Sequence, residues 1–122
     1  MRLLTHNSLK SIAKGTRDGF PLKLEIDEME VRESEVNLSF VKDLIPGLDW
    51  NGVLVAAAAV GLQGMPAKFN KAILEDESFL KAVHNLLLDI HIQRGTLVCP
   101  DTGTRYPILD GLPNMTLPEG DL

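Results

Sequence analysis

The chain has 122 residues, a net charge of −5 and 44% hydrophobic residues, which suits one compact unit with its own core. The acidic balance argues against a protein that binds nucleic acid through phosphate contacts alone, because that affinity comes mainly from Lys and Arg. A lone cysteine, Cys99, excludes an internal disulfide and fits a reducing compartment. Residues 1–6 lack the apolar segment of a signal peptide, and the most apolar stretch, 53–62, is too short to cross a bilayer. We therefore expect a soluble protein of the cytoplasm and nucleus.

A half-buried strand is the first element that the sequence predicts. Apolar and charged residues alternate in the run Leu22, Lys23, Leu24, Glu25 and Ile26. The apolar phase then shifts to Met29 and Val31. Such a shift would turn the buried face outward, so a bulge or turn is expected near 27–28. The acidic run at 25–30 is typical of the solvated face of a sheet.

Three helices are predicted next. Asn37 or Ser39 caps the first helix, which ends at 46–47 where Pro and Gly follow each other. Asp49 caps the second helix, which is expected to run to about Val60 and contains an alanine run that favours helix. The third begins near residue 76, with apolar residues at helical spacing.

The period of the pattern returns to two after the third helix. Leu88, Ile90 and Ile92 alternate with polar residues, which indicates a strand at 88–93. Arg94 and Gly95 are predicted to form a turn, after which 96–99 returns as a second strand. A further turn at 100–103 and a third short strand at 104–109 complete the set.

The order of elements predicts an α+β fold. The first strand has no local partner and cannot be stable alone, so it is expected to pair with the C-terminal strands. The sequence thus divides into a small antiparallel sheet lobe built from both termini, 1–35 and 89–122, and a three-helix insertion at 36–88. The apolar tail 112–117 is extended, because each proline biases its predecessor away from helix. It packs either on its own helices or on a partner chain.

A degenerate metal motif lies between the last strands. The run Cys99-Pro100-Asp101-Thr102-Gly103 has the outline of a zinc knuckle in which threonine replaces the second cysteine. A knuckle supplies two thiolates to a tetrahedral site, and a threonine cannot do so. To complete a site the chain would need its histidines, His6, His84 and His91. We expect a turn that holds no zinc.

Catalytic and cofactor motifs are also absent from the sequence. Cys99 or a serine would need a neighbouring base to act as a nucleophile, and no glycine-flanked nucleophile elbow is present. The glycines at 15 and 19 follow no predicted strand and lack GxGxxG spacing. A turn is the better interpretation there, so neither S-adenosylmethionine nor a nucleotide is expected to bind this loop.

Four segments of the chain together resemble a known family. They are Met1-Arg2-Leu3-Leu4-Thr5-His6-Asn7, Gly19-Phe20-Pro21-Leu22, Phe79-Leu80-Lys81-Ala82-Val83-His84-Asn85-Leu86-Leu87-Leu88, and Cys99-Pro100 through Gly111-Leu112-Pro113-Asn114-Met115. They look like the eukaryotic multifunctional methyltransferase activator subunit, also called the tRNA methyltransferase activator subunit. The resemblance covers nearly the whole chain in the same order.

The resemblance implies a non-catalytic subunit in a two-lobed α+β fold, with a sheet lobe that is zinc-ribbon-like but has lost its metal. Family members bind several class I methyltransferases as heterodimers, help them bind S-adenosylmethionine, and so act on tRNA, rRNA and a translation release factor. Some members hold zinc with four cysteines. The matching positions here are Ser11, Gly15 or Thr16, Cys99 and Thr102, so the chain resembles a zinc-free branch.

Partner binding is expected on the sheet lobe. The apolar, extended tail lies near a sheet edge, where its backbone could pair with an edge strand of a partner. The predicted contact residues are Thr5, Asn7, Phe20, Pro21, Leu112, Pro113, Asn114 and Met115. Two other functions stay open: a stand-alone RNA-binding module with a degenerate zinc ribbon, and a small autonomous enzyme.

Overall fold

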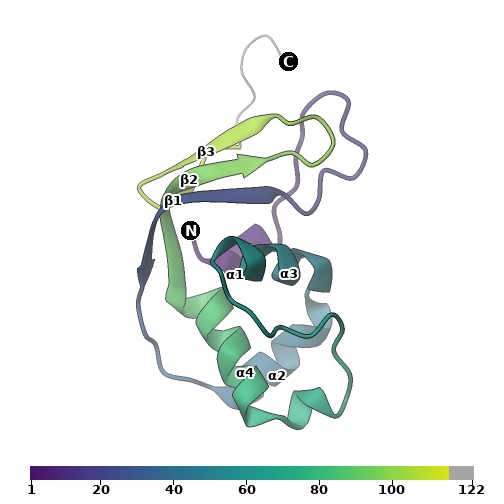
Figure 1. The fold of residues 1–122 in the computed structure, drawn as a ribbon, viewed down its shortest axis with the longest axis vertical. Helices are drawn as coiled ribbons and strands as arrows, with labels where there is room; N and C mark the ends of the chain where they lie inside the picture. Colours follow the sequence, from purple (N-terminus) through teal and green to yellow (C-terminus); the bar gives the residue numbers. More distant parts are fainter. Residues whose placement is uncertain (116–122) are drawn as a thin grey trace.

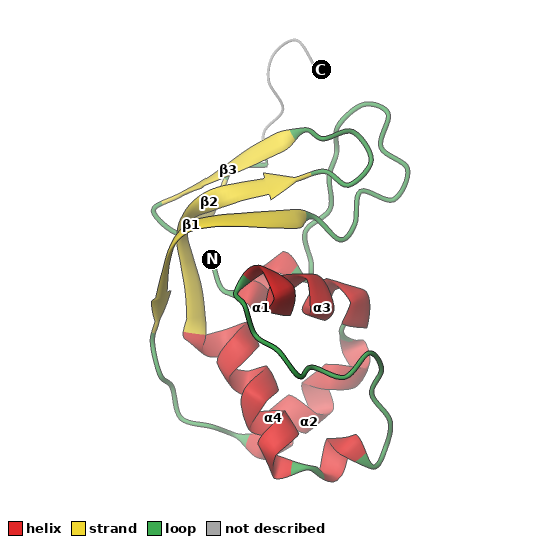
Figure 2. Cartoon of the chain, viewed as in Figure 1, coloured by secondary structure: helices red, strands yellow, loops and turns green. Residues whose placement is uncertain are grey.

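A computed structural model describes residues 1–115 of the chain. The elements are α1 (Leu3–His6), β1 (Lys23–Val31), α2 (Leu38–Leu44), α3 (Trp50–Ala59), α4 (Glu77–His84), β2 (Ile90–Val98), β3 (Arg105–Leu109) and β4 (Leu112–Pro113). The short 3₁₀ turns η1 (Ile45–Gly47) and η2 (Ile73–Glu75) and the π-helical turn η3 (Asn85–Asp89) lie among the helices. The sheet forms one end of the molecule and the helices the other (Figures 1 and 2). The predicted α+β class is confirmed.

The four strands form one antiparallel sheet in the order β1-β2-β3-β4. The predicted pairing of the first strand with the C-terminal strands is confirmed, since Lys23 lies opposite Val98 and Val31 opposite Ile90. The bulge expected near 27–28 is also present: the register shifts between Ile26 and Glu28 and again before the next residue. Pairing with β2 thus gives β1 the hydrogen bonds and packing that a lone strand lacks.

The turn predicted at Arg94–Gly95 is wrong, because β2 runs through it without a break. Gly95 lies opposite Ile26, at the bulge. A Cβ at Gly95 would clash with the backbone oxygen of Glu25. The glycine therefore allows close approach of two strands, which is a second common reason for glycine within a strand.

Helix caps in the insertion follow the sequence prediction. The side chain of Asn37 accepts a hydrogen bond from the N–H of Phe40 at the start of α2. Asp49 accepts from the N–H of Gly52 at the start of α3. Asp76 caps α4 in the same way. These local bonds satisfy N–H groups that the first turn of a helix leaves open.

The strand predicted from Leu88 begins two positions later. Leu88 and Asp89 lie in the π-helical turn η3, which continues α4 directly into β2. The wider turn places the side chain of Asp89 against that of His84, with Oδ1 3.3 Å from Nε2. Alternation of residue type alone could not show this, because the tertiary partner of Asp89 lies in the preceding helix.

One hydrophobic core joins the two predicted lobes. Leu3, Val83 and Ile108 come from α1, α4 and β3 and belong to the same buried cluster. The division into 1–35, 89–122 and 36–88 therefore stays a prediction about organisation, and residues 116–122, including the apolar Leu117, lie outside the described range. Across residues 1–115, no helix has the length and apolar content needed to cross a membrane.

Candidate functional site

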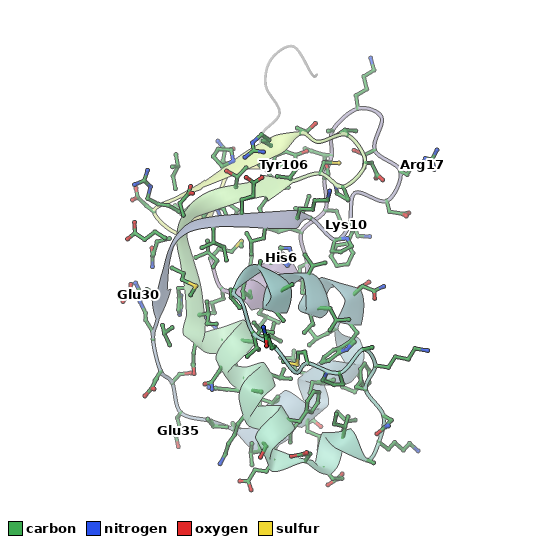
Figure 3. All side chains as sticks on the ribbon, viewed as in Figure 1. His6, Lys10, Arg17, Glu30, Glu35 and Tyr106 are labelled. Atoms are coloured by element: carbon green, nitrogen blue, oxygen red, sulfur yellow. The ribbon has the colours of Figure 1, made fainter. Side chains whose placement is uncertain are left out.

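The loop before β1 is held against the turn before β3. One carboxylate oxygen of Asp101 accepts hydrogen bonds from three successive N–H groups, those of Arg17, Asp18 and Gly19, at 2.9, 3.1 and 2.9 Å. Bonds from Gly19 and Arg17 lower the pKa of Asp101 most. The loop thus closes over the end of the sheet, with the Arg17 side chain pointing away from it (Figure 3).

A cluster of hydroxyls surrounds the thiol beneath this loop. Ser11 Oγ lies 3.4 Å from Thr16 Oγ1, which lies 3.6 Å from Cys99 Sγ. The N–H of Thr102 donates to the same sulfur at 3.4 Å. Burial raises the pKa of Cys99, but hydrogen bonds from Ser11, Thr102 and Thr16 outweigh it and lower the value to about 6. The four positions that the resemblance assigned to zinc therefore do meet in space.

The donor set does not fit zinc. A structural site needs thiolates or imidazoles, and only Cys99 among these four residues offers one. The hydroxyls are engaged with each other, with the thiol and with Tyr106, whose OH lies 2.8 Å from Ser11 Oγ. Within residues 1–115, no group of three or more His, Cys, Asp and Glu side chains is placed to hold a metal ion. Absence of a bound metal stays a prediction.

The histidines form no nucleophile-and-base pair with Cys99. His6 is buried under the sheet, where its Nε2 lies 2.7 Å from the carbonyl of Leu22 and burial lowers its pKa (Figure 3). Ser34 Oγ donates to Asp89 at 2.6 Å and lies 3.1 Å from His84 Nε2. Ser34 and Asp89 both approach Nε2 of His84. In a catalytic triad the nucleophile and the carboxylate contact different nitrogens of the imidazole ring, so this arrangement is not a triad.

Three of the predicted partner-binding residues line one groove. Asn7, Phe20 and Pro21 border an open groove of about 500 Å³ between the loop before β1 and the start of α3. The Asn7 side chain donates to the carbonyl of Asp49 at 2.8 Å and accepts from its N–H at 3.0 Å. A Cβ at Gly52 would lie 2.8 Å from the Asn7 side chain and 2.9 Å from the Phe20 ring, so a larger residue there would displace these side chains.

Four further predicted residues lie at the β4 edge of the sheet. Leu112 pairs with Leu109, and Pro113 with Ile108. The N–H of Asn114 donates to the carbonyl of Pro107 at 2.8 Å, and Met115 is half-buried against the core. Leu112 is 71% exposed. Among residues 1–115, no strand covers the outer side of β4.

Seven of the eight predicted residues therefore form two groups and not one patch. Thr5 is exposed on α1, close in sequence to Asn7. Sequence reasoning missed Leu109, which is 58% exposed beside Leu112. The Asp110–Gly111 turn could have indicated this position in the sequence, because a two-residue hairpin turn places its flanking residues, Leu109 and Leu112, opposite each other.

Comparison with solved structures finds a similar fold in one chain of a complex responsible for methylation. A chain from "Structure of E. cuniculi Mtq2-Trm112 complex responible for the methylation of eRF1 translation termination factor" superposes with a TM-score of 0.62. The match covers 95% of each chain at 16% sequence identity, and so concerns the fold alone. The sequence model of the Trm112p-like protein family matches residues 2–111, and this chain belongs to that family.

Curated relatives match along nearly their whole length. The Arabidopsis thaliana multifunctional methyltransferase subunit TRM112 homolog A is 37% identical over 124 residues, which is 100% of both chains. The mouse TRM112-like protein is 40% identical over 119 residues, covering 96% of this chain and 94% of its own. The Saccharomyces cerevisiae subunit is 32% identical over 131 residues, with 97% of each chain covered.

Proposed function

We propose that this chain is a non-catalytic subunit that binds and activates class I S-adenosylmethionine-dependent methyltransferases as one half of a heterodimer. Membership of the Trm112p-like family over residues 2–111 carries the proposal, because relatives of the same length are named multifunctional methyltransferase subunits. The methylated substrates would be tRNA, rRNA and a translation release factor. The similar fold in a complex named for eRF1 methylation is in keeping with the last of these.

The chemistry of the described residues supports a role without catalysis. The thiol of Cys99 is surrounded by hydroxyl groups instead of a base. The imidazole of His6 is engaged by the backbone carbonyl of Leu22. S-adenosylmethionine would be bound by the partner, and no zinc would be required here. A subunit that binds the folded, cofactor-competent enzyme raises its population by mass action. We place the complex in the cytoplasm and nucleus.

The edge of β4 is the surface we assign to the partner. A two-residue strand with an exposed Leu112 and an open outer side can be extended by an edge strand of another chain. Pro113 has no N–H, so in β4 an added strand would donate to a carbonyl oxygen without receiving a bond in return there. Half-buried Met115 lies next to this edge and adapts to differently shaped surfaces, which suits several enzymes that compete for one subunit.

A co-purification followed by a binding assay tests the function. Proteins retained by the tagged full chain are identified by mass spectrometry, and the methyltransferase found is then expressed with and without it. We expect S-adenosylmethionine to bind the mixture, bind the enzyme weakly, and not bind this chain. Turnover by this chain alone would instead make it an enzyme. Salt-dependent RNA binding by this chain alone, with no enzyme retained, would make it an RNA-binding module.

A further inference from the structure

A row of charged side chains crosses the sheet near its lower end, away from β4. His91 on β2 lies opposite Glu30 on β1 and forms a β-bridge with Arg2 on its other side. Side chains directly opposite on neighbouring strands share a face of the sheet. Gln93, two residues along β2 on that face, donates to Glu30 at 3.4 Å, as expected from this placement. Arg2, His91 and Glu30 therefore point to the same side.

This row borders a pocket of about 300 Å³ between the N-terminal segment, β2, and the linker from β1 to α2. Arg2, Arg32, Ser34, His84 and His91 line its polar part. The ring of Phe40, which is 50% exposed, forms an apolar wall. The pocket therefore combines two guanidinium groups with a hydroxyl and two imidazoles.

Positive charge gathers around His91, although the chain carries −5 overall. Burial lowers the pKa of His91, and the cations of Arg32, the Met1 amino group and Arg2 lower it further. Glu30 acts against them more weakly. At this end of the pocket nearby cations therefore outweigh the nearby anion, which favours a negatively charged ligand.

Acidic residues also lie at the pocket. Asp89 is already bonded to the N–H and hydroxyl of Ser34. Glu33 and Glu35 line the pocket at the linker, on either side of Ser34 in the sequence. Glu35 lies at the outer margin of the molecule (Figure 3).

The two arginines are available to a ligand. No carboxylate lies within ion-pair distance of Arg2 in the described part of the chain. Arg32 is paired with Glu30 at 3.0 Å, but both side chains are more than half exposed. Such exposed pairs are weak and give way to a better partner. Guanidinium groups are the donors that suit phosphate oxygens best.

We propose that the pocket of Arg2, Arg32, Ser34 and His91 binds a phosphate group. The two guanidinium groups hold its oxygens, while the hydroxyl of Ser34, which donates to Asp89, only borders the inner end of the site. Phe40 provides a surface for an organic group that carries the phosphate. The site uses other residues than the hydroxyl cluster and β4, although the amino group of Met1, next to Arg2, donates to the carbonyl of Gly111 just before β4. The proposal does not rest on the methyltransferase partner.

Nuclear magnetic resonance on the full chain, with any tag at the C-terminus, tests the site. Inorganic phosphate, adenosine 5′-monophosphate and adenosine are titrated separately at constant ionic strength. We expect both phosphates to cause saturable shifts at the amides of Arg2, Ser34 and His91, and adenosine to cause none. Tighter binding of the nucleotide would assign the phosphate to a larger molecule, and equal binding to free phosphate.

Charge-matched variants separate the site from non-specific attraction. Arg2→Gln should weaken phosphate binding roughly tenfold, the factor that corresponds to about 1.4 kcal/mol. Arg17→Gln removes the same charge from the far side of the molecule and should leave the affinity unchanged (Figure 3). Equal effects of the two variants, shifts scattered over the surface, or binding of adenosine without phosphate would each overturn the proposal.

Discussion

The hydroxyl of Tyr106 lies 2.8 Å from Oγ of Ser11, joining β3 to a loop 95 residues earlier in the chain. Both side chains are buried, and the same hydroxyl accepts a hydrogen bond from the N–H of Ile12 at 3.3 Å. This contact ties down the loop at the positions where the family resemblance leads us to expect zinc ligands in some members. Hydrogen bonding and aromatic burial hold the loop to β3 here.

Tyr106→Phe should lower the free energy of unfolding by about 1–2 kcal/mol, because the aromatic ring stays while Ser11 and the N–H of Ile12 lose a buried partner. Chemical denaturation of the full chain measures the change. Lys14→Ala, at an exposed loop position, is the control and should have little effect. Equal stability of Tyr106→Phe and the parent chain would show that the hydroxyl does not anchor the loop.

Cys99 should make stability depend on pH between about 6 and 9. Its pKa is about 6 in the folded chain against 9.0 ordinarily, so between these values the unfolded chain binds a proton that the folded chain does not. Stability from this thiolate is therefore complete above pH 9 and is lost as the pH falls toward 6. Denaturation of the parent and Cys99→Ser chains at pH 6, 7.5 and 9 should show a difference that grows with pH; a constant difference would contradict the shift.

The helical part was predictable because its signals are local. Asn37, Asp49 and Asp76 each cap a helix a few residues away, and a cap is decided within one turn. A turn was wrongly predicted at Gly95 because its actual role depends on β1, about 70 residues earlier in the chain. There Gly95 lies opposite Ile26 and allows the two strands to come close. Ser34 drew no attention in the sequence, since nothing near it shows the contact with Asp89.

The geometry of the hydroxyl cluster predicts that a zinc site can be restored. Ser11, Thr16 and Thr102 all contact Cys99, so the triple variant Ser11→Cys, Thr16→Cys, Thr102→Cys would place four thiolates together. We expect elemental analysis to find one zinc in this variant and none in the parent chain. A chelator should destabilise the variant alone. Stoichiometric zinc in the parent chain, or none in the variant, would refute this.

The partner-binding edge is tested with exposed positions at the two edges of the sheet. Leu112 on β4 is 71% exposed and Val31 on β1 is 59% exposed, so lysine at either site should leave the free subunit folded. If the methyltransferase adds a strand to β4, Leu112→Lys would force a charge into a desolvated contact and should weaken binding at least tenfold, or about 1.4 kcal/mol. Val31→Lys should bind as the parent does. Isothermal calorimetry measures both affinities, and thermal melting checks both folds.

Variants of Met115 test whether the proposed contact extends beyond β4. Its side chain is half-buried against the core, so its loss affects the free subunit as well as the complex. Met115→Ala should cost about 1–2 kcal/mol of binding if the side chain is an anchor. Met115→Lys should do more, since the charge has no partner there. A folded Met115→Lys subunit that no longer binds supports the contact. If that subunit unfolds, Met115 belongs to the core.

If Val31→Lys abolishes binding while Leu112→Lys does not, the partner docks at β1 and the assignment to β4 is wrong.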